Sequence, residues 1–404
     1  MDIQKFSEVN SGPLPLLRSL RINAINEFSM DHPDTMTPPT VPLFSSAVNL
    51  KEFILHSERS PFLSHFVFPN LTTFELSGMP AQEGFRALDL LNFLEASPML
   101  QTIRMKIIAD ILLGGVPHEK IVVLPHVETF GLVMDDGGAG YEIAARISCP
   151  SAKRTSLMHE RDTGIVVPRE ILPNPISWDA IARQYTRSPV EAVSLKIECT
   201  RNARISCSVT FRYPGEAAFT LGFKVAESDE EEDAIQVPFP EMHYEVLSQA
   251  SRVIRDHPLL VHVKHISISH GVFVHGSNWF TRAADEVGQL FKSVGPLESL
   301  TIFQSDLYLY LSPFINDPKF YDTQRPVVSL PIKELNISHP LHLSDNEMRM
   351  AGIVELAKSY HAQGIPLERV SVSMERIPAV LAERLRPWVG TVDCHEEMEP
   401  DWDY

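Results

Sequence analysis

The sequence predicts an α/β solenoid, with parallel strands on one face and helices on the other. Three observations predict this fold. A short apolar phrase recurs along nearly the whole chain, helical patterns lie between many of its copies, and one long gap between copies contains two alternating stretches. Self-similarity at an interval of roughly 20 to 50 residues is typical of repeat proteins, in which neighbouring units bury their apolar faces against each other.

The recurring phrase predicts the strands. It has apolar residues at its first, fourth and sixth positions, usually after a proline or a small polar residue. The last two point to the same face of a strand because side chains alternate, and the first lies on the turn before it. Each copy therefore predicts a short buried strand. The copies are Leu17-Leu20-Ile22, Leu50-Phe53-Leu55, Leu71-Phe74-Leu76, Leu100-Ile103-Met105, Val127-Phe130-Leu132, Ala152-Thr155-Leu157, Val190-Val193-Leu195, Val263-Ile266-Ile268, Leu297-Leu300-Ile302, Ile332-Leu335-Ile337 and Leu367-Val370-Val372.

Helical patterns separate many of the copies. The clearest covers 280–294, where apolar residues recur at offsets of three and four, and others are predicted at 344–364, near 84–97 and near 242–256. Short strands joined by helical crossovers become parallel neighbours, and right-handed crossovers repeated in one direction give a curved stack. We therefore expect a single irregular leucine-rich-repeat-like solenoid over 1–404.

The gap between Val190 and Val263 interrupts this array. It contains the alternating stretches 205–211 and 219–225, which flank a Tyr-Pro-Gly-Glu turn and predict a β-hairpin. The acidic run 227–233 follows, and its like charges favour a solvated loop, with a regulatory docking site as the alternative. The hairpin and the acidic loop form a predicted insertion at about 198–240, and 393–404 is predicted to be an acidic tail.

Composition limits the partners and the compartment. Lys and Arg number 35 against 52 Asp and Glu, a formal net charge of −17, so we expect neither nucleic acid nor an anionic membrane as a partner. The start of the chain lacks the apolar segment of a signal peptide, and no uninterrupted apolar run is long enough to cross a bilayer, which predicts a cytoplasmic or nuclear protein. The four cysteines lie far apart without a CxxC pair, so neither a disulfide framework nor a zinc site is predicted.

Three stretches carry a resemblance to a known family. LPLLRSLRI (14–22), FPNLTTFEL (68–76) and LLNFLEASPML (90–100) strongly resemble the repeat region of mushroom F-box/leucine-rich-repeat proteins, and the resemblance covers most of the chain. In that family an F-box module binds the adaptor of a cullin-based ubiquitin ligase, and the repeat region is thought to select a substrate. The resemblance therefore implies a substrate-recognition region. Because the ladder of phrases begins by Leu17, we expect no F-box in this chain, and binding of a ligase adaptor stays open.

The sequence offers little for catalysis. The motifs GxSxG, GxxxxGK[ST], HExxH and GxGxxG after a strand are all missing, so we expect no catalytic residues and no cofactor. His262, His265, His270 and His275 match no standard metal-site spacing, and we expect them at the surface or the edge of the core rather than on a metal. Asp135-Asp136-Gly137-Gly138 predicts a turn.

The side chains that alternate with the buried ones define the predicted binding surface. They occupy positions two, four and six after each first apolar residue, and their formal charges number six positive against three negative (Glu52, Glu75, Glu334), a balance of +3. This balance favours an acidic or phosphorylated protein partner. The predicted protein-binding residues are Arg21, Glu52, Glu75, Arg104, Lys106, Arg154, Lys196, Phe303 and Arg369.

The function predicted from these observations is a non-catalytic protein–protein interaction module, with substrate recognition for an F-box ubiquitin ligase as its narrower form. Repeat proteins present extended surfaces to their partners, and no catalytic framework competes with that interpretation. The alternative is a structural or self-associating repeat scaffold without a ligase role. An enzyme is the third class, and it would need a pocket with convergent titratable groups.

Overall fold

The contacts within the chain divide it into two compact units. Unit 1 comprises 1–162, 169–187 and 216–224, and unit 2 comprises 163–168, 188–215 and 225–404. The sequence predicted one array with an insertion at about 198–240, and two boundaries between the units fall inside that stretch, after Gly215 and after Lys224. The computed structural model describes residues 14, 16–24, 47–57, 63, 66–77, 85–107, 111–117, 119–135, 137–161, 175–185, 189–199, 205–225, 239–257, 260–271, 277–303, 310–315, 330–339, 346–374 and 379–396.

Unit 1 contains strands in the order β1-β2-β3-β5-β8-β10-β13. The pairs from β1 to β10 are parallel, and β13 begins beside β10, because the N–H of Ala218 donates to the carbonyl of Lys153 at 2.7 Å. The strands are β1 (Ser19–Ala24), β2 (Glu52–Ser57), β3 (Thr73–Ser77), β5 (Thr102–Ile107), β8 (Thr129–Met134), β10 (Arg154–Arg161) and β13 (Ala218–Val225), with the short pairs β4 (Phe85–Arg86) and β6 (Ile111–Leu112), and β7 (Val122–Val123) and β9 (Ile147–Ser148). The helices are α2 (Ala87–Glu95), α3 (Gly137–Ala144) and α4 (Pro175–Tyr185).

Unit 2 contains strands in the order β12-β11-β14-β15-β16-β17-β18. β11 and β12 pair in antiparallel fashion, and the pairs from β11 through β18 are parallel. The strands are β11 (Ala192–Cys199), β12 (Ile205–Arg212), β14 (His265–Gly271), β15 (Leu297–Phe303), β16 (Ile332–His339), β17 (Arg369–Met374) and β18 (Thr391–Glu396). The helices are α5 (Phe239–Arg255), α6 (Ser277–Ser293), α8 (Asn346–Ala362) and α9 (Ala379–Leu385), with the 3-10 helices η3 (Leu260–His262) and η4 (Ser312–Phe314).

Every copy of the apolar phrase forms a strand, so these sequence predictions are confirmed, as is the mixed α/β class with mostly parallel strands. In unit 1 the fourth positions of the phrases lie side by side from Leu20 in β1 to Thr155 in β10, and the sixth positions do the same from Ile22 to Leu157. Both rows are buried. Since neighbouring strands lie about 4.8 Å apart, each apolar side chain packs on the equivalent one in the next strand, and burial of each Leu or Phe contributes about 1.5–3 kcal/mol.

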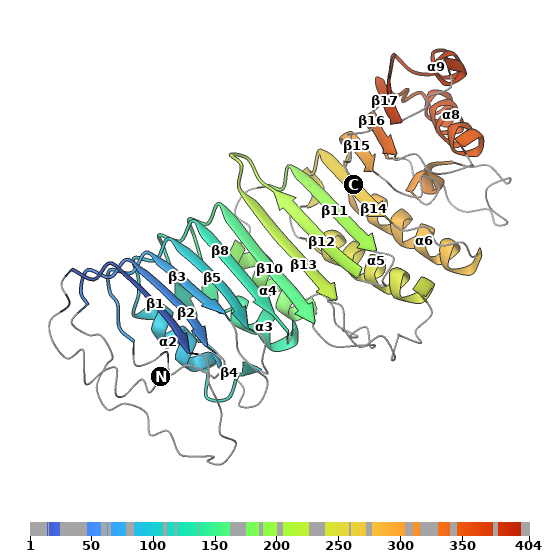
Figure 1. Ribbon diagram of the computed structural model, residues 1–404. Helices are drawn as coiled ribbons and strands as arrows, with labels where there is room; N and C mark the ends of the chain where they lie inside the picture. Colours follow the sequence, from blue (N-terminus) through green and yellow to red (C-terminus); the bar gives the residue numbers. More distant parts are fainter. Residues whose placement is uncertain are drawn as a thin grey trace, which may run out of the picture. The chain divides into compact units, whose positions relative to one another are not determined.

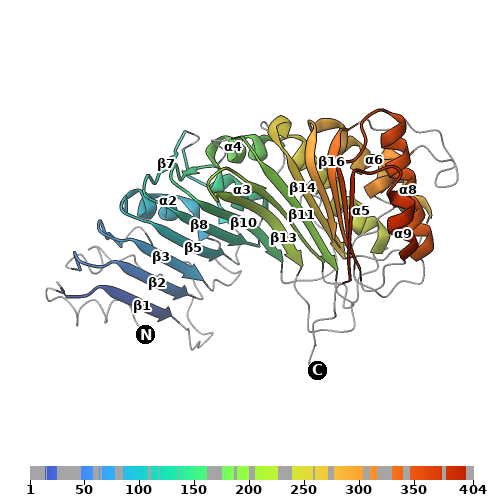
Figure 2. The same cartoon turned by 90° about the horizontal axis from the view of Figure 1, so that it is seen from above.

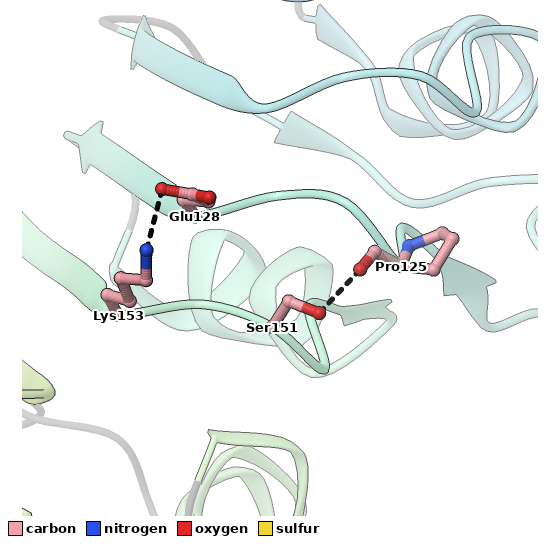
Figure 3. A network of polar contacts seen from close by, with 4 residues as sticks. All are labelled: Pro125, Glu128, Ser151 and Lys153. Carbon is pink, nitrogen blue, oxygen red and sulfur yellow. Dashed lines mark hydrogen bonds and ion pairs between the residues drawn. The ribbon is translucent and has the colours of Figure 1, made fainter. Parts of the chain in front are cut away.

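A repeated turn precedes the strands of unit 1. The N–H of Leu50 donates to the carbonyl of Ala47 at 3.1 Å just before β2, and the equivalent bond three residues back precedes β1, β3, β5, β8 and β10. Neighbouring turns also contact each other through side chains. Figure 3 shows Ser151 Oγ donating to the carbonyl of Pro125 at 2.6 Å, between the turns that precede β10 and β8.

A line of backbone carbonyls fixes the register from strand to strand. The carbonyl of Arg18 accepts the N–H groups of both Lys51 and Glu52, at 2.8 and 3.0 Å. A carbonyl oxygen has two lone pairs, so one carbonyl can anchor the start of the next strand twice. We call the carbonyls that do this in unit 1 the carbonyl ladder: Arg18, Lys51, Thr72, Gln101 and Glu128. In unit 2 the carbonyls of Glu191 and Lys264 each accept two N–H groups in the same way.

In each unit the helices lie on one side of the strands (Figures 1 and 2). The predicted helices near 84–97, 242–256, 280–294 and 344–364 are confirmed as α2, α5, α6 and α8. α8 ends at a glycine, since Gly364 has a φ of 75° and the N–H of Ile365 donates back to Tyr360 at 3.1 Å. No helix among those described combines the length and apolar content of a membrane span.

The structure corrects two predictions about irregular segments. The acidic tail was predicted at 393–404, but 393–396 belong to β18, where Val392 and Cys394 align with Val370 and Val372 of β17. The turn predicted around Asp135–Gly138 becomes the start of α3 at Gly137. The acidic run 227–233 and the rest of the predicted tail lie outside the described residues, whereas both alternating stretches of the predicted hairpin are strands, β12 and β13.

The close approach of α3 to β8 depends on Gly140. A Cβ at Gly140 would lie 2.0 Å from Met134 Sδ and 3.0 Å from Met134 Cβ, whereas a Cβ at Gly288 in α6 would lie 3.8 Å from Pro313 Cβ. We expect Gly140→Ala to lower the free energy of unfolding by about 1–3 kcal/mol, because it overpacks the core. Gly288→Ala is the matched control, and it should raise that free energy by about 0.5–1 kcal/mol because alanine favours a helix. Urea denaturation measures both, and an equal effect would contradict the packing argument.

His257 makes the stability of unit 2 depend on pH. The side chain is 3% exposed, its ring stacks on Phe211 with 4.5 Å between centroids, and burial lowers its pKa from 6.5 to about 4. The unfolded chain therefore binds this proton more readily, so stability present above pH 6.5 is lost as the pH falls toward 4.

We expect His257→Leu to reduce the loss of unfolding free energy between pH 7 and pH 5 by about 2 kcal/mol. Urea denaturation at both pH values measures it, with the exposed His262→Leu as control, and an unchanged loss in His257→Leu would refute the assignment.

Candidate binding surface

The side of the strands away from the helices is the candidate site. Along β2, Phe53 and Leu55 are buried while Glu52, Ile54 and His56 are half-buried, and β1, β3, β5, β8, β10, β11, β12, β14 and β17 show the same alternation of buried and non-buried residues. We call the side formed by the non-buried positions the open face of each unit. Because the strands are in register, open-face residues at equal heights form rows across neighbouring strands.

The nine predicted binding residues all occupy open faces, divided between the units. Unit 1 carries six of them and unit 2 carries three, so the structure brings them together as two separate groups. Phe303 in unit 2 is the large apolar member and is 39% exposed. The unit 1 group is Arg21, Glu52, Glu75, Arg104, Lys106 and Arg154, and the unit 2 group is Lys196, Phe303 and Arg369.

Most of the predicted cations are already paired with carboxylates. Arg104 Nη1 lies 2.8 Å from Glu75 Oε1, and Lys106 Nζ lies 2.9 Å from Glu160 Oε2. In unit 2, Lys196 pairs with Glu198 at 2.6 Å and Arg369 with Asp393 at 2.7 Å. The predicted balance of +3 therefore overstated the free positive charge, because it left out Glu160, Glu198 and Asp393.

Sequence reasoning missed these carboxylates for a specific reason. The phrase covers three open-face positions per strand, but β10 and β11 are eight residues long and carry a fourth, which Glu160 and Glu198 occupy. Continuing the alternation by two residues would have found both. Asp393 was assigned to the tail, and Lys224 lies on β13, which was treated as an insertion.

Two of the predicted cations have no carboxylate partner among the residues that the structure describes. Arg21 Nη2 donates to His56 Nε2 at 3.1 Å, and the nearby Glu52 accepts from Ser19 Oγ at 2.5 Å. Arg154, at the start of β10, is exposed and forms no ion pair within the described segments. Arg154 is thus the charge on this face most available to a partner.

Glu160 connects two lysines on different strands. Its carboxylate lies 2.9 Å from Lys106 Nζ on β5 and 3.7 Å from Lys224 Nζ on β13. Partial burial opposes the charged form, but the hydrogen bond and the charge of Lys106, with those of Lys224, hold the pKa of Glu160 below its ordinary value. The cluster of Lys106, Glu160 and Lys224 therefore carries one net positive charge at neutral pH.

The open face of unit 2 is built differently. Its central row runs through Ser194, Ser267, Thr301, Asn336 and Ser371, in register across β11, β14, β15, β16 and β17. Asn336 Nδ2 donates to Thr301 Oγ1 at 3.4 Å. These short side chains are all half-buried, so the row consists of hydroxyl and amide groups rather than of long charged side chains.

A charged line borders this row at the starts of the strands. Glu191, Lys264, Glu298, Lys333 and Glu368 alternate in sign from β11 to β17. Lys264 Nζ lies 3.1 Å from Glu298 Oε1, and the hydrogen bond and charge of Lys264, with smaller contributions from His265 and Lys333, lower the pKa of Glu298. Each such surface pair contributes little to stability, but the alternation favours this strand register over others.

The predicted histidine cluster gives no metal centre in the described part of the chain. His262 is exposed, and His265 Nδ1 lies 2.8 Å from Ser299 Oγ on the neighbouring strand. The side chain of His270 and all of His275 lie outside the described residues. Within the described segments, no group of three His, Cys, Asp or Glu side chains is placed to hold a metal ion.

Comparisons with known proteins assign no family to this chain. No protein-family model matches this chain, and no curated protein sequence matches it. The resemblance of the apolar phrases to F-box/leucine-rich-repeat proteins therefore stays an expectation from the sequence. The function has to be inferred from the open faces themselves.

Proposed function

We propose that this chain is a non-catalytic protein-binding module of the leucine-rich-repeat kind, and that its open faces contact the partner. The observation that carries the proposal is the open face itself, with its rows of aligned, half-buried or exposed strand side chains. In each unit the helices lie on the other side of the strands (Figure 1). A sheet face that no described helix covers offers a broad, preformed contact area, which suits a macromolecule better than a small ligand.

The location of the strongly perturbed titratable groups supports a non-catalytic role. Burial raises the pKa of Cys207 to about 12 and raises those of Tyr185, Tyr213 and Tyr360, while it lowers that of His257 to about 4. Cys207, Tyr213, His257 and Tyr360 are buried in the core. Catalytic groups need both a shifted pKa and access to substrate, and these groups combine the shift with burial.

Substrate selection for a ubiquitin ligase is the narrower form of this proposal. It rests on the resemblance of the phrases at 14–22, 68–76 and 90–100, and recovery of a cullin-ligase adaptor with the protein would support it. The alternative, a self-associating scaffold, is favoured by the sheet edges. Among the described strands, β1 pairs only with β2, and β18 pairs only with β17, so each offers backbone groups to an added strand.

The proposal is tested by adding one arginine to an open face or to a helix. Ser156→Arg in unit 1 and Thr301→Arg in unit 2 place bulk on the open faces, while Asn92→Arg in α2 and Gln289→Arg in α6 place the same residue on exposed helix positions. We expect proteins captured from native lysate by the wild type, identified by mass spectrometry, to be lost with an open-face variant and kept with both helix variants.

Thermal unfolding must first show that the four variants are folded. Equal loss of partners in the helix and open-face variants, or retention in all four, would contradict binding through the open faces. A concentration-dependent increase in mass by analytical ultracentrifugation, with no other protein captured, would instead support the scaffold.

A further inference from the structure

The open face of unit 1 keeps unpaired positive charge on both ends of β10. At the start of β10, Arg154 has no carboxylate partner in the described part of the chain, and at its end Lys106 and Lys224 share the single carboxylate of Glu160. The side chain of Lys224 is 52% exposed and that of Glu160 is 21% exposed. The lysine can therefore turn toward solvent, while the glutamate is largely shielded by its neighbours on the sheet. Anionic groups are therefore attracted to two places on this face.

Between these two places β8 contributes small and apolar residues, and Arg104 of β5 and Ser156 of β10 lie beside Gly131 in register. Gly131 on β8 has no side chain, and a Cβ there would meet only the carbonyl oxygen of Ile103, at 3.8 Å. Val133 on β8 and Met158 on β10 are neighbours in register and half-buried on the same side. The space above Gly131 can take an apolar side chain of a partner, with Val133 next to it on the same side of β8.

The separation of the charged places sets the size of the partner segment. Glu160 lies six positions after Arg154 along β10, and at about 3.3 Å per residue this is about 20 Å. An extended segment of about six residues has the same length. Acidic residues near both ends and an apolar residue near the middle would match the charges and the apolar centre together.

We propose that the open face across β5, β8, β10 and β13 binds an extended acidic segment of another protein, with an apolar side chain over Gly131 and carboxylates at Arg154 and at Lys106 and Lys224. This inference rests on the proposed binding function and names the site and the chemical class of partner. Glu160 then acts as a resident carboxylate that competes with the partner for the two lysines.

The described residues of unit 2 do not show this combination on the open face. There Lys196 and Arg369 each have a carboxylate of their own, in Glu198 and Asp393, and the central row is made of small polar side chains. An acidic segment would gain little charge attraction from such a face. The two units therefore supply matched control positions for the same substitutions.

The test measures binding of a probe peptide to the purified full chain by fluorescence anisotropy. The probe is a fluorescein-labelled peptide of about eight residues with one central leucine among glutamates, and the reference peptide has glutamines in their place. We expect the acidic probe to bind more tightly than the reference, with an affinity that falls as NaCl rises from about 50 to about 300 mM.

Substitutions then separate this site from the rest of the molecule. Arg154→Glu should weaken probe binding by about fivefold or more, and Glu160→Gln should strengthen it by about two- to fivefold, because surface charge pairs contribute up to about 1 kcal/mol each. Gly131→Leu should weaken binding without any change of charge. The matched unit 2 variants Lys196→Glu and Glu198→Gln should leave it unchanged, and Arg154→Gln serves if Arg154→Glu does not fold.

The direction of the Glu160→Gln effect is the decisive readout. A purely structural role for Glu160 predicts weaker binding in this variant, so weakening would overturn the proposal. Equal binding of both peptides, or equal effects of Arg154→Glu and Lys196→Glu, would also overturn it. If partners are lost with Ser156→Arg or Thr301→Arg while Arg154→Glu does not affect the probe, the acidic-segment site fails and the broader binding function stands.

Discussion

The structure of each unit depends on the register between parallel strands, and the doubled hydrogen bonds at the strand starts hold that register. In unit 1 each carbonyl of the carbonyl ladder accepts two N–H groups from the next strand. A shift by one residue would move the apolar rows to the open face and the charged residues into the core, because side chains alternate along a strand. Core and binding surface are thus two consequences of one hydrogen-bonding pattern.

Register also explains why the charges of the open faces are largely neutralised. Glu75 and Arg104 are direct neighbours on β3 and β5, so their ion pair follows from alignment alone. Lys106 and Glu160 lie on β5 and β10, with β8 between them, and their contact has to cross about 10 Å of sheet above β8. Long side chains can do this only where the intervening strand carries short ones, and the residue of β8 in register with Lys106 is Val133.

The strands could be predicted from the sequence because each one has two apolar residues in a fixed place. Thr155 is polar, but it still occupies the row of fourth positions in β10. Its neighbour Phe130 on β8 and the sixth-position residue Leu157 are apolar and fix the orientation of the strand. β18 was missed because its only apolar residues, Val392 and Cys394, are half-buried and its composition is acidic; its pairing with β17 outweighs that composition. α3 was missed because it begins with glycines, which reflect its close packing on Met134 rather than a turn.

The candidate surface could be predicted as a face, but not as a set of charges. Periodicity determines on which side Arg104, Lys106 and Arg154 lie. It does not show which carboxylate meets which cation, since Lys106 reaches past its neighbour on β8 to Glu160. Three residues alter the charge balance: Glu160, Glu198 and Lys224. They lie near the ends of long strands or on β13, which the repeated phrase does not cover, so its spacing does not predict their positions.

The difference between the two open faces follows from how each one balances its charges. In unit 2 Lys196 and Arg369 each have their own carboxylate, so neither cation is left to attract a partner. In unit 1 two lysines share Glu160, and Arg154 has no carboxylate partner in the described segments, so the ion pairs of these residues leave positive charge over. A chain with a net charge of −17 repels acidic partners at long range, and binding one requires a local excess of positive charge strong enough within about 8–10 Å to overcome that repulsion. The part of unit 1 around β10 provides such an excess next to an apolar centre, so affinity there would come from short-range contact rather than from long-range attraction.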